Sequence, residues 1–393
     1  MRHLAFEFSA RPPAAVARSV VLAAVAAVSA CGGSASGTDG AAAQAALVAQ
    51  GQQIFSCGPI GDEAVTALSV GLKVDSDALP PAVVEGIRNG SVDLHSPATT
   101  VALLKLNAVV GLKATIETVN GVDKLARVGI TCALCHATVD NAFAPGIGKR
   151  LDGWANRDLN PGAIMALSPA VASATKTALN AWGAGKFDPR HNVDGLSKAV
   201  VIPPAYGLEG IHRITVTGDG NDIAYWNRYV AVAEMGGLGT VSEPRLNLNI
   251  TQGTQDLVSA KLPALQAYQL SLKAPAAPAG SFDVAAAARG KLLFEGAGRC
   301  ASCHSGTTFT DANLRLHPAS DSMAEPESPS YASRSATKQY RTSPLKGVWQ
   351  HAPYFHDGSA ATLEAVVQTY NTRQSLGLTH QQMADLAQYL KSL

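Results

Sequence analysis

Two short segments of the sequence carry the residue types that attach a haem covalently. Each has two cysteines separated by two residues and followed by a histidine: Cys132-Ala133-Leu134-Cys135-His136 and Cys300-Ala301-Ser302-Cys303-His304. The two thiols of such a motif can add to the two vinyl groups on one porphyrin edge, while the histidine presents its imidazole to the iron. A zinc site would need four ligands, which neither motif easily supplies. We therefore expect two covalent haem c groups, with His136 and His304 as proximal ligands.

The first thirty residues have the pattern of a bacterial export signal. Three arginines precede an apolar run over residues 19–30, which has the length of a signal-peptide core and is too short to span a bilayer. The run ends at Ala30-Cys31-Gly32, in the manner of a lipoprotein cleavage site, although an ordinary cleavage site beside a chance cysteine is the alternative. We expect a signal peptide over 1–30, a lipid on Cys31, a flexible tether over 31–46 and a periplasmic protein anchored to the membrane.

The composition bounds the class of protein. The chain has 393 residues, of which 47% are hydrophobic and 16% charged, as expected for a globular protein of two domains. Lys and Arg number 31 against 30 Asp and Glu, so the chain lacks the excess of basic residues that is typical of nucleic-acid-binding proteins. Cys57 is left over from the motifs and the lipid site, and we interpret it as an incidental thiol.

The pattern of apolar residues predicts mostly helix. Helical spacing occurs over 45–55, 100–119 and 257–272, and no long alternating strand pattern is present. A Pro/Ala/Gly linker over 273–280 separates a domain over 47–272 from a second domain over 281–393. We therefore predict a mostly α fold with two cytochrome c-like haem domains and long loops.

The second domain has clear helix boundaries. Ser281 or Asp283 can cap a helix over 285–294, which leads into the second haem motif. Thr379 and Gln382 form a capping-box pattern before the C-terminal helix. The stretch 316–338 is rich in Ser, Pro, Ala and Glu and predicts a long loop.

One block of the second domain resembles the diheme cytochrome c peroxidase and MauG family. The block runs from Pro344 through Ala352-Pro353-Tyr354-Phe355-His356-Asp357-Gly358 to Val367, and the resemblance extends over 290–393. It is weaker in the first domain, where it rests on the haem motif, on residues 203–208 and on Tyr225-Trp226-Asn227. The resemblance implies that the N-terminal haem reacts with peroxide or oxygen and that the C-terminal haem stores or relays an electron.

The resemblance also implies a sixth ligand for the second haem. The family places a Met or, in MauG-type enzymes, a Tyr on the helix after the Ala-Pro-Tyr-Phe-His block, and that position is Tyr370. A phenolate stabilises ferric and higher iron states, so it moves the site away from simple electron relay. A tyrosine packed within its helix is the alternative. Met323 in the polar loop and Met383 on the last helix are poorer candidates.

The first haem is expected to have an open sixth position. No histidine lies between His136 and His191, although the family's distal histidine would follow the motif closely. Such a position is where peroxide or oxygen can bind. Met165, His191 and His212 are other possible distal groups, and Glu234 is a candidate for moving the proton in O–O cleavage.

Two further roles follow from the resemblance alone. Trp226 is expected to lie between the haems, with Trp154 and Trp182 as alternatives and core packing as the competing interpretation. Calcium is expected to bind the main-chain carbonyls of His351 and Pro353, together with an unidentified Asn.

The residues and the resemblance together predict a periplasmic diheme oxidoreductase of the peroxidase or MauG type. Its partners would be hydrogen peroxide or oxygen and a redox protein, namely a cytochrome, a cupredoxin or an oxidised client protein. A non-catalytic diheme electron carrier and a haem-dependent oxygenase of an apolar substrate are the alternatives.

Overall fold

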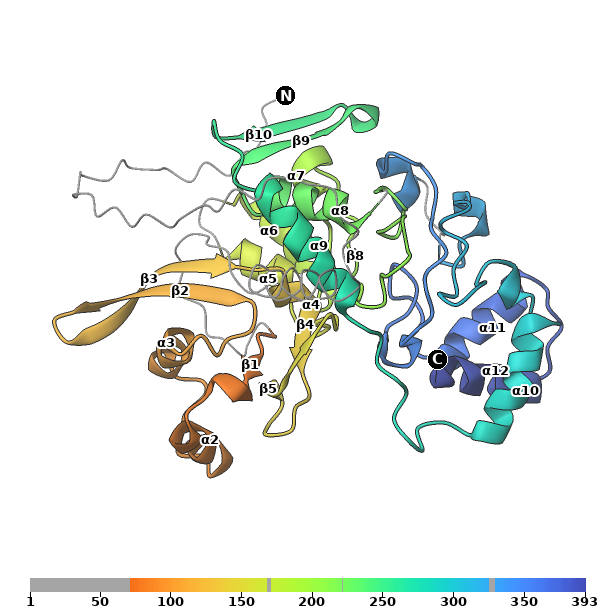
Figure 1. Ribbon diagram of the computed structural model, residues 1–393, viewed down its shortest axis with the longest axis horizontal. Coiled ribbons are helices and arrows are strands. Elements are labelled where there is room, and N and C mark those ends of the chain that lie inside the picture. The colour runs from red at the N-terminus through yellow and green to blue at the C-terminus, as the bar shows by residue number, and fades with distance from the viewer. Residues whose placement is uncertain (1–70, 168–170, 221, 325–328) are drawn as a thin grey trace, which may run out of the picture.

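The computed structural model describes residues 71–167, 171–220, 222–324 and 329–393 (Figure 1). The expected export signal, Cys31, the tether, Cys57 and the helix expected over 45–55 lie outside these residues. Within the described ranges, no helix is long and apolar enough to cross a membrane.

We call residues 281–393 the C-terminal half and the described residues up to 272 the first half. Three helices organise the C-terminal half: α10 (Val284–Glu295), α11 (Leu363–Arg373) and α12 (His380–Ser392). Figure 1 shows them grouped together, apart from the elements of the first half. Asp283 caps α10 by accepting a hydrogen bond from the Ala286 amide at 2.9 Å. Thr379 and Gln382 form the expected capping box on α12. The helix boundaries predicted around the second haem motif are therefore confirmed.

Gly290 sets how closely α10 and α12 pack. A Cβ atom at this position would lie 2.1 Å from the backbone oxygen of Asp385, so only glycine permits this approach. Phe294 and Tyr389 meet edge to face beside it, with ring centroids 5.2 Å apart. Leu363 and Val367 of α11 belong to the same buried cluster. This packing fixes the end of α10, from which the chain enters the second motif.

The linker and the loop expected in the C-terminal half have little regular structure. The linker over 273–280 contains no helix or strand, and Trp349 Nε1 donates a hydrogen bond to the Pro275 carbonyl at 3.3 Å. The expected loop over 316–338 contains two short 3₁₀ turns among its described residues, Ala319–Asp321 and Tyr331–Arg334.

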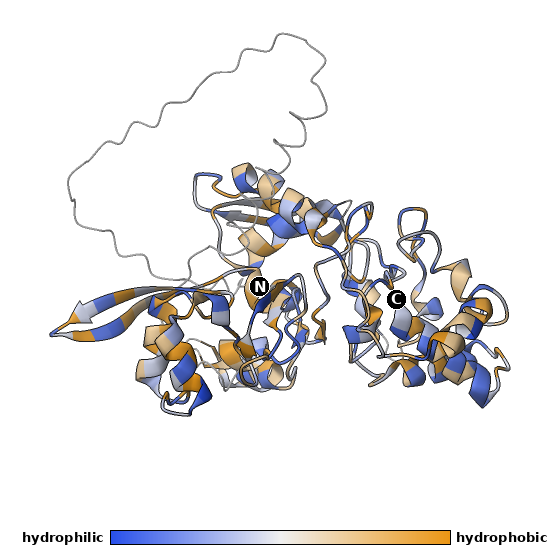
Figure 2. Cartoon of the chain, turned by 60° about the horizontal axis from the view of Figure 1, so that its bottom comes forward, coloured by the Kyte–Doolittle hydropathy of each residue, from blue (hydrophilic) through white to orange (hydrophobic). Residues whose placement is uncertain are grey.

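The helix predicted over 100–119 is wrong in its second half. Helix α3 (Pro97–Lys105) ends early, and a hairpin follows, made of β2 (Leu112–Val119) and β3 (Val122–Ile130). Asn120 and Gly121 join the two strands with φ of 52° and 78°, the conformation of a tight hairpin turn. Thr and Val residues in β2 favour strand, and tertiary pairing decides the outcome. Figure 2 shows this hairpin extending away from the body.

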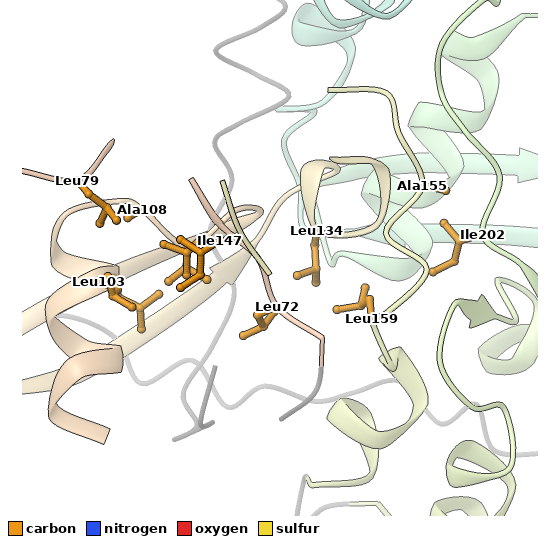
Figure 3. Packing of buried hydrophobic residues seen from close by; sticks show 12 residues of the cluster. Leu72, Leu79, Leu103, Ala108, Leu134, Ile147, Ala155, Leu159 and Ile202 are labelled. Carbon is orange, nitrogen blue, oxygen red and sulfur yellow. The ribbon is translucent and has the colours of Figure 1, made fainter. Parts of the chain in front are cut away.

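The first half is consequently a mixture of short helices and strands around a buried cluster. Leu72, Leu103, Leu134, Ile147 and Leu159 lie in this cluster (Figure 3). β1 (Val74–Asp75) pairs in parallel with β5 (Ile147–Gly148), which ties the start of the described chain to the region after the first motif. Helix exceeds strand in the described residues, but the mostly α expectation fits the C-terminal half better than the first.

The remaining elements of the first half are short. Helix α9 (Leu262–Ser271) confirms the helix expected within 257–272. The others are α2 (Pro81–Arg88), α4 (Ala133–His136), β4 (Ala137–Val139), β6 (Arg150–Asp152), α5 (Pro161–Ala166), α6 (Ser173–Asn180), β7 (Lys186–Phe187), α7 (His191–Asp194), β8 (Val200–Val201), α8 (Ile223–Tyr229), a π-helical turn (Val230–Glu234), β9 (Gly239–Glu243) and β10 (Leu248–Gln252).

Buried ion pairs join the two halves. Arg334 reaches Asp188 at 2.9 Å and Asp194 at 2.7 Å, and its side chain is 3% exposed. Arg190 pairs with Asp219, and the Ala336 amide donates to Asp219 at 3.1 Å. Because these opposite charges pair with one another, the junction can be polar and nevertheless largely buried.

Candidate haem sites

The first motif lies on a single helical turn. Cys132 precedes α4, and Cys135 and His136 lie on that helix, so both thiols and the imidazole come from one turn of chain. The His136 Nδ1 lies 3.0 Å from the carbonyl oxygen of Pro203. A hydrogen bond donated there holds the ring and leaves Nε2 for an iron. Burial lowers the pKa of His136, which favours the neutral imidazole that ligates metals.

The second motif repeats this arrangement on a different element. A 3₁₀ turn over Cys300–Ser302 carries the first thiol, and Cys303 and His304 follow directly. His304 Nδ1 lies 3.1 Å from the Phe309 carbonyl oxygen. Burial also lowers the pKa of His304. Two unrelated local structures thus present the same set of donor atoms.

The burial of the thiols fits covalent haem. Burial raises the pKa of Cys132 and Cys300 to about 11 and that of Cys135 to about 12. These three sites favour uncharged sulfur and therefore suit a thioether, which carries no charge at any pH. The donor set of each motif therefore fits a haem c group, held by the two sulfurs and the histidine.

One further cluster has metal-ligand chemistry but belongs to the second motif. Cys303 Sγ and the ligand atoms of Asp311 and His317 lie within 4.8 Å of one another. Asp311 is already bound by Arg315 at 2.7 Å and by His317 at 3.0 Å. Since haem attachment would occupy the sulfur of Cys303, we do not assign a separate metal site here.

Tyr370 lies in the second haem region. It is on α11. Burial raises the pKa of its phenol to about 12, and Cys300 and Cys303 are close enough to contribute to this rise. Its ring centroid is 6.3 Å from that of Phe355. The structure therefore brings Tyr370 to the second motif, and its ligation of iron stays a prediction.

The two methionine alternatives differ from the sequence interpretation. Met323 is 7% exposed although its loop is polar, and the neighbouring Ser322 carbonyl accepts a hydrogen bond from Arg373 of α11 at 3.3 Å. The loop thus folds back toward the helix of Tyr370, which makes Met323 a stronger candidate than the sequence indicated. Met383 lies on α12 and packs against α11, with its sulfur 3.3 Å from the Nδ2 atom of Asn371.

The tryptophans named as candidates lie in different surroundings, and the role of Trp226 between the haems stays a prediction. Trp226 stacks on Tyr229 within the first half, with ring centroids 5.0 Å apart and planes at 12°. Trp154 instead meets Trp349 of the second half edge to face at 5.8 Å. It follows Gly153, whose amide donates to the His136 carbonyl at 2.9 Å. Trp154, one of the alternatives, therefore joins the first motif to the C-terminal half.

The other candidate groups lie in local environments of their own. The Trp182 Nε1 donates to Ser197 Oγ at 2.8 Å, and its ring packs on His191, whose Nδ1 lies 2.7 Å from the Leu196 carbonyl. His212 is exposed. Met165 packs with Trp182, and Glu234 lies near Tyr229, whose pKa it helps to raise. The distal roles expected of these groups stay predictions.

The Ala-Pro-Tyr-Phe-His block lies at the junction of the halves. His351 Nε2 is 2.9 Å from the hydroxyl of Tyr206, and burial lowers the pKa of His351 to about 3. Arg157 is close enough to lower the pKa of both His351 and His136. The sequence analysis did not single out Arg157, because the residues around it form no recognisable motif. Calcium binding by the His351 and Pro353 carbonyls stays a prediction.

Comparison with known proteins found a family match within the C-terminal half. Residues 339–376, which include Tyr354 and Tyr370, match a family described as RoxA-like, cytochrome c-like. No curated protein matches the chain. Solved structures with some similarity include hydrazine synthase of Kuenenia stuttgartiensis, at 19% identity and a TM-score of 0.35 over 50% of this chain and 73% of that one. A MauG-like protein associated with microbial copper homeostasis matches at 21% identity and 0.33, over 49% and 73%.

These findings define the class. Residues 339–376 are cytochrome c-like, and the motif over Cys300–His304, which precedes them in the chain, is of the kind that binds haem c. The match contains the whole block that resembles the diheme peroxidase and MauG group, Pro344 to Val367, and it supports that resemblance. The family match and the two motifs thus support haem c as a cofactor of this chain and an oxidoreductase activity in general.

Proposed function

We propose that this chain is a two-haem c-type oxidoreductase, with peroxide or oxygen reacting at the first haem and electrons passing through the second. The observation that supports this is the difference between the two motifs. Tyr370 lies beside Cys300 and Cys303, whereas Arg157 is the charged group acting on His136. A phenolate can ligate iron, which favours a closed second site, whereas the absence of a histidine between His136 and His191 favours an open first one.

The residues of the chain would divide the work as follows. When bound, the haems supply one-electron chemistry and, at an open iron, a place for peroxide or oxygen. The Pro203 and Phe309 carbonyls orient the two proximal imidazoles. Tyr370, with a pKa of about 12, would give up its proton only beside a strong local positive charge such as ferric iron.

Aromatic contacts offer a route between the halves. Trp154 and Trp349 meet at 5.8 Å, and Trp154 also lies 6.4 Å from the Tyr206 ring. We therefore prefer Trp154 to Trp226 as the residue between the two sites. Glu234 stays a candidate for moving the proton, and the only support for this role is its position in the π-helical turn directly after α8.

The spin states of the ferric protein test the proposal. The purified full-length protein should contain two haems per chain and show one high-spin and one low-spin signal in electron paramagnetic resonance. Stopped-flow mixing with peroxide, and of the reduced protein with oxygen, should change only the high-spin haem. Two low-spin signals would reject the open first site and favour the electron carrier.

Export and anchoring are part of the proposal and need a separate test. We expect Cys31→Ser to move the protein from the membrane fraction to the soluble periplasmic fraction, because the lipid is lost. Cys57→Ser is the matched control and should leave the distribution unchanged. Recovery of the wild-type protein and both variants in the cytoplasm would contradict export.

The redox partner needs its own test. Binding of a reduced cytochrome or cupredoxin to the full-length protein would identify it.

A further inference from the structure

Arg157 is a half-buried cation without a matching anion among the described residues. Its Nε and Nη1 atoms are buried and have no hydrogen-bond partner. Two other buried arginines, by contrast, have carboxylate partners: Arg334 pairs with Asp188 and Asp194, and Arg190 pairs with Asp219. An unpaired buried donor destabilises the folded protein, and a charged donor does so more strongly. The native protein is therefore expected to hold an acceptor at this place.

The surroundings of Arg157 offer no carboxylate from the described part of the chain. Tyr206 and Tyr354 are the groups that stabilise its charge, while burial lowers its pKa to about 10. The adjacent Asp158 pairs with Lys73 instead, and its side chain is 70% exposed. We therefore look for the missing acceptor outside the polypeptide.

The position of Arg157 is fixed relative to the first motif. The amide of the preceding Asn156 donates to the Cys135 carbonyl at 2.8 Å, and its side-chain amide donates to the Leu134 carbonyl at 3.2 Å. These bonds tie the backbone before Arg157 to the turn that carries the two thiols. Tyr354 of the C-terminal half is also close enough to Arg157 to stabilise its charge.

Arg341 is another buried arginine without a carboxylate partner among the described residues, and it is a weaker candidate. Its Nη1 already donates to the Arg213 carbonyl at 3.0 Å, so only Nε lacks a partner. Arg157, and not Arg341, is the arginine whose charge lowers the pKa of His136. Arg157 is therefore the better placed of the two to meet a group bound at the first motif.

We propose that Arg157 binds a carboxylate of the haem attached at Cys132 and Cys135, and so positions that haem at the junction of the two halves. A haem c keeps two carboxylates after its vinyl groups have reacted, and a guanidinium binds a carboxylate through two parallel hydrogen bonds. The proposal rests on the presence of the first haem in the proposed function. Arg157 acts through the haem carboxylate and is a positioning residue.

The test compares Arg157→Gln with Arg157→Lys in the full-length haem protein. Loss of a nearby positive charge favours ferric iron, so in R157Q the ferrous-to-ferric ratio of the first haem at a fixed potential should fall about tenfold, a 59 mV shift. The second haem should change much less. In resonance Raman spectra the propionate bending mode of the first haem should move in both variants, because lysine keeps the charge but not the two-point contact.

Two controls test whether these changes are specific to a haem carboxylate held by Arg157. Arg88→Gln removes an exposed guanidinium that lies over Phe143 at 4.7 Å, and should leave both potentials and the Raman mode unchanged. Adding acetate to the wild-type protein should have no effect. A titratable response to acetate would show that a diffusible carboxylate occupies the site and would overturn the assignment.

The failures are distinguishable. If wild-type protein carries no haem at the first motif, the proposed function itself fails. If wild-type protein carries two haems but R157Q keeps the potential and the propionate mode, only the role of Arg157 is rejected. If R157Q loses the first haem during maturation, R157K decides: an unchanged propionate mode overturns the proposal, and a shifted mode supports it.

Discussion

Tyr370 and Met323 compete, at the scale of single residues, for the second haem. Tyr370 lies near the two thiols of the motif, and Met323 is buried in a loop segment that is hydrogen-bonded to the same helix. We expect Tyr370→Phe to convert the low-spin signal of the second haem to high spin, because phenylalanine cannot ligate iron. Electron paramagnetic resonance of the ferric protein measures this directly.

Met323→Leu is the matched variant for that experiment. Leucine preserves the buried apolar volume, so the fold should be kept at a cost below about 1.5 kcal/mol. The low-spin signal should survive in this variant. The opposite pattern, with loss in Met323→Leu and retention in Tyr370→Phe, would transfer the ligand role to the methionine.

Glu243 offers a prediction on pH at the end of strand β9. Arg245 binds its carboxylate at 2.7 Å and Tyr225 donates to it at 3.1 Å, and the arginine holds the pKa of Glu243 at about 2. Because the folded pKa lies below the unfolded value, this stabilisation is present above pH 4.5 and is lost as pH falls toward 2.

Glu243→Gln should therefore lower the stability by roughly 1–3 kcal/mol at neutral pH and by much less near pH 2. Thermal unfolding at a series of pH values measures the difference. A constant difference between wild-type protein and variant at all pH values would show that the charge of Glu243 is unimportant.

At the scale of secondary structure, the contact between α10 and α12 depends on Gly290. An added Cβ atom would meet the Asp385 backbone at 2.1 Å, and a backbone atom cannot swing away. We expect Gly290→Ala to destabilise the C-terminal half by about 1–3 kcal/mol despite the higher helix propensity of alanine. Thermal unfolding followed by circular dichroism measures the effect.

Ala288→Ser is the control on the exposed face of the same helix. Its effect should stay within about 0.5–1 kcal/mol, since serine changes only helix propensity there. Equal losses in both variants would show that propensity and not the helix contact governs α10.

For the whole molecule, the pairs of Arg334 with Asp188 and Asp194 join the two halves. Arg334→Met leaves two carboxylates without their cation, and should cost about 3–5 kcal/mol. Calorimetry should then show a lower unfolding temperature, and limited proteolysis should cut between the halves earlier than in wild-type protein.

A second variant tests the mechanism of that loss. Adding Asp188→Asn to Arg334→Met removes one of the unpaired charges and should restore part of the stability. No recovery in the double variant would mean that the packing of the Arg334 side chain, and not its charge, holds the junction.

The sequence predicted the local features well where a signal lies within a few residues. The helices beginning after Asp283 and Thr379 appear as expected, because capping depends on neighbours three residues apart. The stretch 100–119 was predicted wrongly, since the pairing of β2 with β3 is decided by partners that local spacing does not show. Arg157 and the contact of Trp154 with Trp349 gave no local signal at all.

The sequence by itself predicts haem chemistry at both motifs, because two thiols and a histidine at fixed spacing leave few other possibilities. The two motifs are equivalent in that respect. The resemblance already assigned Tyr370 to the second motif. The tertiary structure showed Tyr370 near Cys300 and Cys303, brought the loop of Met323 to the helix of Tyr370, and brought Arg157 and Trp154 toward the first motif. The physical reason is that a sixth ligand, a counter-ion and an aromatic contact are all set by residues far apart in the chain, whose approach depends on packing.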